Sequence, residues 1–472
     1  MLNLRQLIRR LDPDILASLE SSLINSKAEN FLVLLREYQN AGASDVLIQE
    51  KLKITANSFY VLKSRLYDKI QEHLSGDVHG SKEEVLRLIH TIPEKCVGEP
   101  REVAMAFLEK LEKDLLYYDM HNELLHVYSA FKKVTLFSDS YFHYSQLYNR
   151  HVAYSLSLEK AEELLGAFVV ALSQYDFSRS PKLLENLVFL GQKIDDYHVL
   201  NPSRQTWLIK QLVMVQLDIF CNVRNAGTTE ELLHSLRNYL SELPGSSPFK
   251  EWETVIDYMC FEYYFAVGQV TLADSFYGKV EKNLDTLCLY NYLCMTSRYF
   301  ISKIRYLQLN NRTALMNDEP VSRIISDPND IHTQVVLGIY SAMSHFYEGH
   351  LKEAAITLNS LLNINSFKDY FHINAEIKLS LAYLYILVSE YDLAANILKN
   401  LSRKIKSDTH GEYQHALDLI RLFQTELKAS SAAATSRQRD LYTLFAARNN
   451  NSRTRLLQHL EYEIQKRYNS LT

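Results

Sequence analysis

The sequence predicts an all-α protein built from antiparallel helix hairpins, and three observations predict it. Glycine and proline supply only 13 and 9 of the 472 residues, and these residues punctuate strands, tight β-hairpins and phosphate-binding loops. Apolar residues recur at i, i+3, i+4 and i+7 along most of the chain, for example in residues 30–39, 183–194 and 206–220. That spacing is the period of a helix with one buried face, and the sustained alternation typical of strands is absent.

The first predicted element is a small helical bundle at residues 1–78. Within it, residues 45–74 divide into a short helix, a turn at Ile54 and a longer helix whose apolar face includes Phe59 and Leu66. This order resembles the helix–turn–helix of bacterial response-regulator and sigma-factor families, in which the second helix enters the major groove. The resemblance implies nucleic-acid contact through residues on the outer face, namely Lys51, Lys53, Asn57, Lys63 and Arg65.

The module also departs from that pattern. Lys53 stands where these families usually have glycine, and Gln49 replaces the small residue that lets the two helices cross closely. Residues 1–75 hold ten basic and nine acidic side chains, a net charge of +1, whereas a duplex-binding surface normally shows a basic excess. A structural or protein-binding bundle therefore stays open beside nucleic-acid contact.

The next element, residues 79–427, contains a repeat that is clearest over residues 257–405. Three segments place large, small, alanine and large residues at the same offsets of 4, 9 and 13 from the first position. The three sets are Tyr264, Gly268, Ala273 and Tyr277; His345, Gly349, Ala354 and Leu358; and Tyr385, Ser389, Ala394 and Leu398.

These residues resemble the tetratricopeptide repeat, a helix–turn–helix unit of about 34 residues. The small residue suits the turn, and the alanine lets the second helix approach the first. The resemblance implies an α-solenoid, with residues 108–131 as an early, degenerate unit. The period here is longer, since Ala354 and Ala394 are 40 residues apart, and the usual trailing proline is missing. Unrelated helical hairpins with alanines in register by chance are the alternative.

The last elements are a linker at residues 428–436, rich in small and polar residues, and a C-terminal region at residues 437–472. We expect a helix over residues 453–468 whose apolar stripe contains Leu456, Leu457, Leu460 and Ile464. The region holds seven basic and three acidic side chains. It is predicted either to cap the solenoid or to bind a partner.

Composition and charge indicate a soluble, cytoplasmic protein. The net charge is −5, with 47% hydrophobic and 23% charged residues, which excludes disorder but identifies no partner. The five cysteines are scattered without a C-x-x-C pair, as expected of reduced thiols. The first residues mix charge into their apolar stretch, unlike a signal peptide, and the longest apolar run, near residues 379–388, is too short to span a bilayer.

No motif for catalysis, cofactor binding or metal binding is recognisable. The chain has no G-x-x-x-x-G-K-S/T, G-x-G-x-x-G or G-x-S-x-G sequence. His121 and His126, and likewise His345 and His350, are five residues apart, which on one helix would place them on different faces. We therefore predict no catalytic, cofactor-binding or metal-binding residues, and we expect no enzyme.

Two functions follow from this organisation. The first is a non-enzymatic intracellular scaffold that binds a protein or peptide along the concave face of the solenoid. The second is a transcriptional regulator in which residues 45–74 bind DNA and the repeats act as a sensor or interaction domain. No membrane partner is expected.

Overall fold

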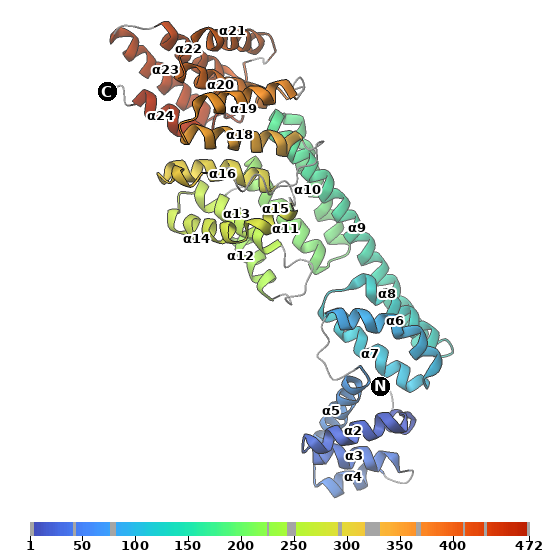
Figure 1. The fold of residues 1–472 in the computed structure, drawn as a ribbon. Helices are drawn as coiled ribbons and strands as arrows, with labels where there is room; N and C mark the ends of the chain where they lie inside the picture. The colour runs from blue at the N-terminus through green and yellow to red at the C-terminus, as the bar shows by residue number, and fades with distance from the viewer. Residues whose placement is uncertain are drawn as a thin grey trace. The chain divides into compact units, whose positions relative to one another are not determined.

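The computed structural model of the protein describes residues 4–40, 44–75, 82–223, 226–242, 252–290, 295–316, 331–364, 370–408, 411–428 and 432–469. Every regular element in these ranges is a helix, so the predicted all-α class is confirmed (Figure 1). None of these helices reaches the length and hydropathy needed to cross a bilayer.

The helices divide into two compact units, which are described separately below. Unit 1 comprises residues 1–161, 197–207 and 243–248, and unit 2 comprises residues 162–196, 208–242 and 249–472. The boundary at Ala161 falls inside a long helix, α9 (Ser140–Ser178). The domain boundaries predicted at 78/79 and 427/428 stay predictions, and the first lies outside the described residues.

Unit 1 begins with short helices that have well-formed N-termini. At the start of the second helix, Asp12 accepts a hydrogen bond of 2.8 Å from the Asp14 N–H and Pro13 is the first helical residue, both favourable features of a helix N-terminus. The helices that lie wholly in unit 1 are α1 (Leu4–Arg10), α2 (Pro13–Asn25), α3 (Glu29–Gln39), α4 (Asp45–Leu52), α5 (Ala56–Ser75), α6 (Lys82–Gly98), α7 (Arg101–Tyr117) and α8 (His121–Val134).

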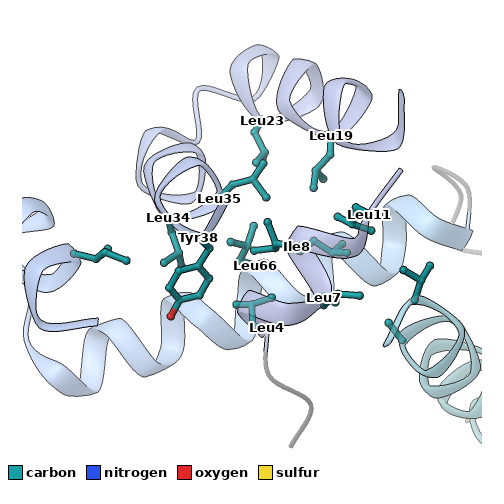
Figure 2. Close-up of a cluster of buried hydrophobic side chains, with 14 of the residues drawn as sticks. Leu4, Leu7, Ile8, Leu11, Leu19, Leu23, Leu34, Leu35, Tyr38 and Leu66 are labelled. Carbon is teal, nitrogen blue, oxygen red and sulfur yellow. The ribbon is translucent and has the colours of Figure 1, made fainter. Parts of the chain in front are cut away.

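An apolar core lies between the N-terminal helices (Figure 2). Leu7 of α1 and Leu34 and Leu35 of α3 are completely buried in it. Val103 and Ala106 of α7 belong to the same cluster. The core of the predicted N-terminal bundle therefore includes side chains from beyond residue 78.

A second core in unit 1 forms between α6, α7 and α8. It contains Leu111 and Leu115 of α7, Leu124 and Phe131 of α8, and Val85 of α6. The ring of Phe131 stacks on that of Tyr144 in α9, with centroids 4.1 Å apart. Helix α7 thus supplies side chains to both cores of unit 1.

Of the described helices, α9 is divided between the two units, and α10 (Pro181–Leu200) and α11 (Arg204–Cys221) lie mostly within unit 2. Its other elements are α12 (Ala226–Glu242), α13 (Trp252–Ala266), α14 (Val270–Lys282), α15 (Leu284–Tyr290), α16 (Met295–Leu309), the 3-10 helix η2 (Thr313–Leu315), α18 (Ile331–Tyr347), α19 (Leu351–Ile364), α20 (Phe371–Leu387), α21 (Tyr391–Asp408), α22 (Gln414–Lys428), α23 (Ala432–Asn450) and α24 (Glu461–Asn469).

Consecutive helices of unit 2 pack against each other as hairpins: α13 with α14, α18 with α19, α20 with α21, and α22 with α23. Successive hairpins also touch, through α19 with α20 and α21 with α22. An apolar cluster that includes Val335 of α18, Ala354 of α19 and Ile377 of α20 joins two of these hairpins. Neighbouring hairpins therefore bury one another's apolar faces.

The C-terminal helix is shorter than predicted. It begins at Glu461, whereas the sequence pattern predicts a helix from Arg453. Leu457 has a φ of 56°, a left-handed conformation that interrupts a right-handed helix. The prediction of a helix over residues 453–460 is therefore wrong, although the stripe residues are all buried.

The predicted linker is partly helical. Lys428 ends α22, and α23 begins at Ala432, so residues 432–436 belong to a helix. Residues 429–431 lie outside the described ranges. Helix α23 continues to Asn450.

Candidate functional site

The residues of the predicted repeat lie at three hairpin turns with the same backbone conformation. Gly268, Gly349 and Ser389 have φ angles of 75°, 86° and 65°. Each lies two residues after the last residue of the first helix of its hairpin, in a left-handed conformation that favours glycine because glycine has no Cβ. Ser389 shows that the third turn keeps this conformation without glycine.

The same backbone hydrogen bonds close all three turns. The N–H after the left-handed residue donates to the carbonyl five residues earlier, which is that of Tyr264, His345 or Tyr385. These bonds measure 2.9 Å, 2.8 Å and 2.9 Å. The first position of each predicted set is thus the residue whose carbonyl accepts the hydrogen bond that closes the turn.

The two later positions of each set are buried in the second helix. Ala273, Ala354 and Ala394 are buried to the same degree, with 0–1% of their surface exposed. The large residues that follow them are also buried, namely Tyr277, Leu358 and Leu398. The first positions differ: Tyr264 is buried and its hydroxyl donates to Glu230 at 3.1 Å, whereas His345 and Tyr385 are half-buried.

Turns with this left-handed residue and closing hydrogen bond also lie in unit 1, at Lys27, Lys53 and Asp119. The turn at Asp119, between α7 and α8, also has buried residues at the offsets of 9 and 13. Asp119 has a φ of 58°, and the Met120 N–H donates to the Leu115 carbonyl at 2.9 Å. Leu115, Asp119, Leu124 and Tyr128 stand at the same offsets as the predicted sets. Residues 108–131 are predicted to form a degenerate unit, but the sequence pattern does not identify these four positions. Asp119 stands at the turn position and Leu124 stands where the other sets have alanine. The signal that could have found it is the 4, 9 and 13 spacing of its buried residues.

The candidate nucleic-acid residues lie on α4, α5 and the turn between them. Lys53, in that turn, has a φ of 53°, which explains why related motifs favour glycine there. Lys51, Lys53, Asn57 and Arg65 are exposed, and Lys63 is half-buried. Lys53 therefore adopts a left-handed backbone conformation that is strained for a residue with a Cβ.

Two of these basic residues already have acidic partners within unit 1. Lys51 forms an ion pair with Glu37, and the Lys63 Nζ lies 3.1 Å from an Asp45 carboxylate oxygen. Asp45 also accepts a hydrogen bond of 2.9 Å from the Tyr38 hydroxyl. Burial raises the pKa of Asp45, but the hydrogen bonds from Lys63 and Tyr38 outweigh it and the pKa is lowered. Asp45 therefore stays charged and holds Lys63 in place.

Apolar side chains are exposed on the same two helices. Val46 and Leu47 of α4 and Tyr60 and Val61 of α5 expose 45–62% of their surfaces. Side chains of this kind favour contact with protein surfaces more than with phosphates. The outer face of the module is thus mixed, with basic and apolar residues side by side in the sequence.

The C-terminal segment, residues 452–469, is held against α16 and α20 of unit 2 by polar contacts. The Leu457 N–H donates to a Glu376 carboxylate oxygen at 2.8 Å. The His459 Nε2 lies 3.0 Å from the Ser380 hydroxyl, and the Gln308 amide donates to the His459 carbonyl at 2.6 Å. The segment therefore connects side chains of α16 and α20.

Arginines of the C-terminal region pair with acidic residues in or beside α22. These pairs are Arg448 with Asp418, Arg453 with Glu412 and Arg467 with Glu426. Leu456, Leu457, Leu460 and Ile464 are buried, with no more than 1% exposed. These three arginines and the apolar stripe of this region thus make their contacts within unit 2.

A cluster of buried charged residues, the polar centre, lies in unit 2. Asp176 at the end of α9 forms an ion pair with Arg298 of α16, and the His332 Nε2 lies 3.5 Å from the same carboxylate. Arg179 approaches Asp176 at 3.6 Å. Burial alone raises the pKa of Asp176, but the Arg298 charge and the His332 hydrogen bond lower it to about 2. Asp176 is therefore an anion that two arginines neutralise.

Glu376 lies beside this centre and behaves differently. Burial raises the pKa of Glu376 to about 7, against the opposing effects of the Leu457 N–H and the Arg179 charge. Its carboxylate oxygens lie 3.9 Å from the His372 Nε2 and 3.9 Å from the His459 Nδ1. Burial lowers the pKa of His459 to about 4, so this imidazole is neutral near pH 7.

Shifted carboxyl groups of this kind often occur in active sites. Here the contacts of Glu376 with Leu457 and His459 join α20 to the C-terminal segment, whereas the contact with His372 lies within α20 itself. The arrangement can hold the C-terminal segment in place. We assign no reaction to it.

The paired histidines do not lie as one helix would place them. Helix α18 ends at Tyr347, so His345 and His350 lie on opposite sides of the turn at Gly349. Their Nδ1 atoms are 3.7 Å and 3.5 Å from the same Glu348 carboxylate oxygen. The spacing argument against a metal ligand pair therefore does not apply to them. In unit 1, His121 faces His151 rather than His126, with Nδ1 atoms 3.1 Å apart.

Comparison of the chain with protein-family models, with curated proteins and with solved structures found no match.

Proposed function

We propose that this chain is a non-enzymatic helical-repeat protein of the tetratricopeptide-like kind, which binds a protein or peptide partner. The observation that carries the proposal is the recurrence of one turn geometry. Four hairpins share a left-handed residue, the same closing hydrogen bond and buried residues at matching offsets. Repeated hairpins that bury one another's faces form extended surfaces, and a rigid surface loses little entropy when it binds a segment of chain.

Exposed apolar side chains near the turns of unit 2 support a binding role. Val270 and Tyr391 occupy the second position after the left-handed residue in their hairpins, and Leu272 and Leu393 occupy the fourth. They expose 40–62% of their surfaces. Most residues of the first helices α13, α18 and α20 are buried. The partner therefore contacts this side of the second helices, in addition to any concave face that the solenoid forms.

The experiment is affinity capture of partners from the native cell lysate after chemical crosslinking, with the wild-type chain and two variants. Leu272→Lys/Leu393→Lys changes the exposed apolar positions, and Lys282→Ala/Lys399→Ala is a matched surface control on the same helices. We expect the first variant to lose a partner that the wild type and the control retain. Capture of no partner by the wild-type chain would count against the proposal.

A second candidate function, a transcriptional regulator that binds DNA through residues 45–74, is favoured by one feature. Lys53, Asn57 and Arg65 are all exposed on the turn and the second helix of a helix–turn–helix. Such positions contact bases and phosphates in proteins that use this motif.

Electrophoretic shift assays with duplex DNA test this second function. Lys53→Glu/Arg65→Glu should abolish retention and flatten its salt dependence, because each lost phosphate contact reduces the salt slope by about one. Lys63 is left unchanged because its ion pair with Asp45 belongs to the module's own packing. If the wild-type chain does not retain DNA at about 50 mM salt, this function is excluded.

A further inference from the structure

The turn between α18 and α19 brings three metal-ligating side chains together. His345 lies in the last turn of α18, Glu348 follows the helix, and His350 precedes α19. One potential ligand atom from each residue lies within 4.8 Å of the others. Among the described residues, no other three histidine, cysteine, aspartate or glutamate side chains converge in this way.

Backbone geometry at this turn creates the convergence. On a continuous helix, residues five apart are separated by about 140° around the axis, so their side chains cannot bind the same metal ion. Here Gly349 turns the chain with a φ of 86°, and the His350 N–H donates to the His345 carbonyl at 2.8 Å. That hydrogen bond joins the backbones of the two histidines and places both imidazoles beside Glu348.

We propose that His345, Glu348 and His350 form a binding site for a divalent first-row transition-metal ion, with Zn²⁺ as the best fit. Zn²⁺ binds imidazole nitrogen and carboxylate oxygen at about 2.0–2.2 Å, which puts the ligand atoms of a tetrahedral site about 3.3–3.5 Å apart. The Nδ1–Oε2 separations of 3.7 Å and 3.5 Å are close to that spacing. The three ligand atoms lie within 4.8 Å of one another, so side-chain rotation must bring all three to this spacing.

The ligand set selects the class of ion. Two nitrogen donors with one oxygen suit zinc, copper and nickel, whereas Mg²⁺ and Ca²⁺ prefer oxygen donors throughout. The three side chains expose 30%, 45% and 62% of their surfaces, but the Nδ1 atom of His345 is itself buried, so an ion reaches that nitrogen only after a side chain at the turn rotates. The fourth position faces outward and takes water or a donor group from another molecule.

The other histidine clusters in the described part of the chain do not offer such a site. In unit 1, the Nδ1 atoms of His121 and His151 face each other, while Asp119 lies 3.2 Å from the opposite nitrogen of His121. In the polar centre, the His459 Nε2 already lies at hydrogen-bond distance from Ser380. The α18–α19 turn is therefore distinct in directing its three donors to one point.

Metal binding would tie the end of α18 to the start of α19. An ion that binds the folded hairpin and not the unfolded chain stabilises it in proportion to the logarithm of its concentration over the dissociation constant. This role does not depend on the proposed partner binding, because it concerns one turn of one hairpin.

Isothermal titration of the full, tag-free chain with ZnCl₂ tests the site. We expect one saturable equivalent in the wild type that MgCl₂ does not replace. Loss of a residue that only supports a ligand already reduces metal affinity about 10–100-fold, so His350→Ala and Glu348→Gln should each weaken this site at least tenfold. His234→Ala, which removes an exposed histidine of unit 2, should leave the titration unchanged.

Melting temperature and Co²⁺ absorption provide two further tests of the site. Zn²⁺ should raise the melting temperature of the wild type and of His234→Ala but not of His350→Ala, whose circular dichroism should match the wild type because position 350 is exposed. Co²⁺ in place of Zn²⁺ should give the intense visible absorption of a tetrahedral site. Absence of saturable Zn²⁺ binding, or equal binding by His350→Ala and the wild type, would overturn the proposal.

Discussion

Gly268, Gly349 and Ser389 adopt nearly the same backbone conformation, yet the cost of that conformation differs between them. A residue with a Cβ loses about 1–2 kcal/mol in the left-handed region, whereas glycine does not. No atom lies within 4 Å of the position that a Cβ would take at Gly268 or Gly349. Any cost of an alanine at these two turns therefore comes from the backbone and not from a clash.

Because the cost at these turns comes from the backbone alone, the effect of a substitution on the free energy of unfolding can be predicted. Gly268→Ala and Gly349→Ala should each destabilise the protein by about 1 kcal/mol, and Ser389→Gly should stabilise it by up to about 1 kcal/mol. Urea denaturation followed by circular dichroism measures these changes in the free energy of unfolding.

Gly278 provides the matched control for these variants. It lies inside α14, without a positive φ, and it also has open space around its Cβ position. Gly278→Ala should therefore stabilise the protein, because alanine is favoured over glycine in a helix by about 1 kcal/mol. Equal effects at Gly278 and Gly349 would refute the assignment of the cost to the turn.

Sequence reasoning is most successful at these turns, because a turn is specified locally. The residues that make the C-cap and the first buried positions lie within 14 consecutive residues, so their spacing is visible in the sequence. The proposed metal site at the α18–α19 turn is not visible to an argument that places His345 and His350 on one continuous helix. Gly349 between them is the residue that indicates a turn instead.

At the scale of elements, the C-terminal segment shows how a distant contact overrides a local pattern. Leu456, Leu457, Leu460 and Ile464 have helical spacing, but the helix begins only at Glu461. The Leu457 N–H donates to Glu376, far away in the sequence, and not to the carbonyl four residues before it, as it would in a helix. Periodicity predicts which side chains are buried, but it cannot reveal a backbone hydrogen bond to a distant carboxylate.

The burial of this segment gives a prediction that separates a cap from a partner-binding helix. Leu460→Ala should destabilise the protein by about 2–5 kcal/mol, because it leaves a cavity at a fully packed position. Leu444→Ala, at a leucine of α23 with 39% exposure, should cost less than about 1 kcal/mol. Thermal denaturation of both variants measures the difference. If the two values are equal, residues 452–469 do not act as a structural cap.

At the scale of the whole molecule, unit 2 contains a polar centre that no local pattern predicts. Asp176, Arg298 and His332 come from three helices that are widely separated in the sequence. Their residue types are common on solvated helix faces, so only the fold shows that they meet. The charges are compensated within the centre, since an isolated buried charge would cost several kcal/mol.

Glu376, at the edge of this centre, makes the stability of unit 2 depend on pH. Its pKa is about 7 in the folded protein and 4.5 in the unfolded chain. The folded state therefore binds this proton more tightly, so its contribution to stability is greatest below about pH 4.5 and is lost as the pH rises towards 7. A shift of this size corresponds to roughly 3 kcal/mol. His459 has the opposite effect, since its pKa falls to about 4 and acid therefore destabilises the fold.

Replacement of Glu376 by glutamine isolates this effect. Glu376→Gln keeps an oxygen that accepts the Leu457 N–H but cannot become charged, so it removes the cost of a buried carboxylate above pH 7. The melting temperature of the variant minus that of the wild type should therefore become more positive from pH 5 to pH 8. Glu353→Gln, at an exposed position on α19, should show no such trend. A difference for Glu376→Gln that is the same at both pH values would mean that Glu376 is not protonated in the folded protein at pH 5, and that its hydrogen bond to Leu457 outweighs burial.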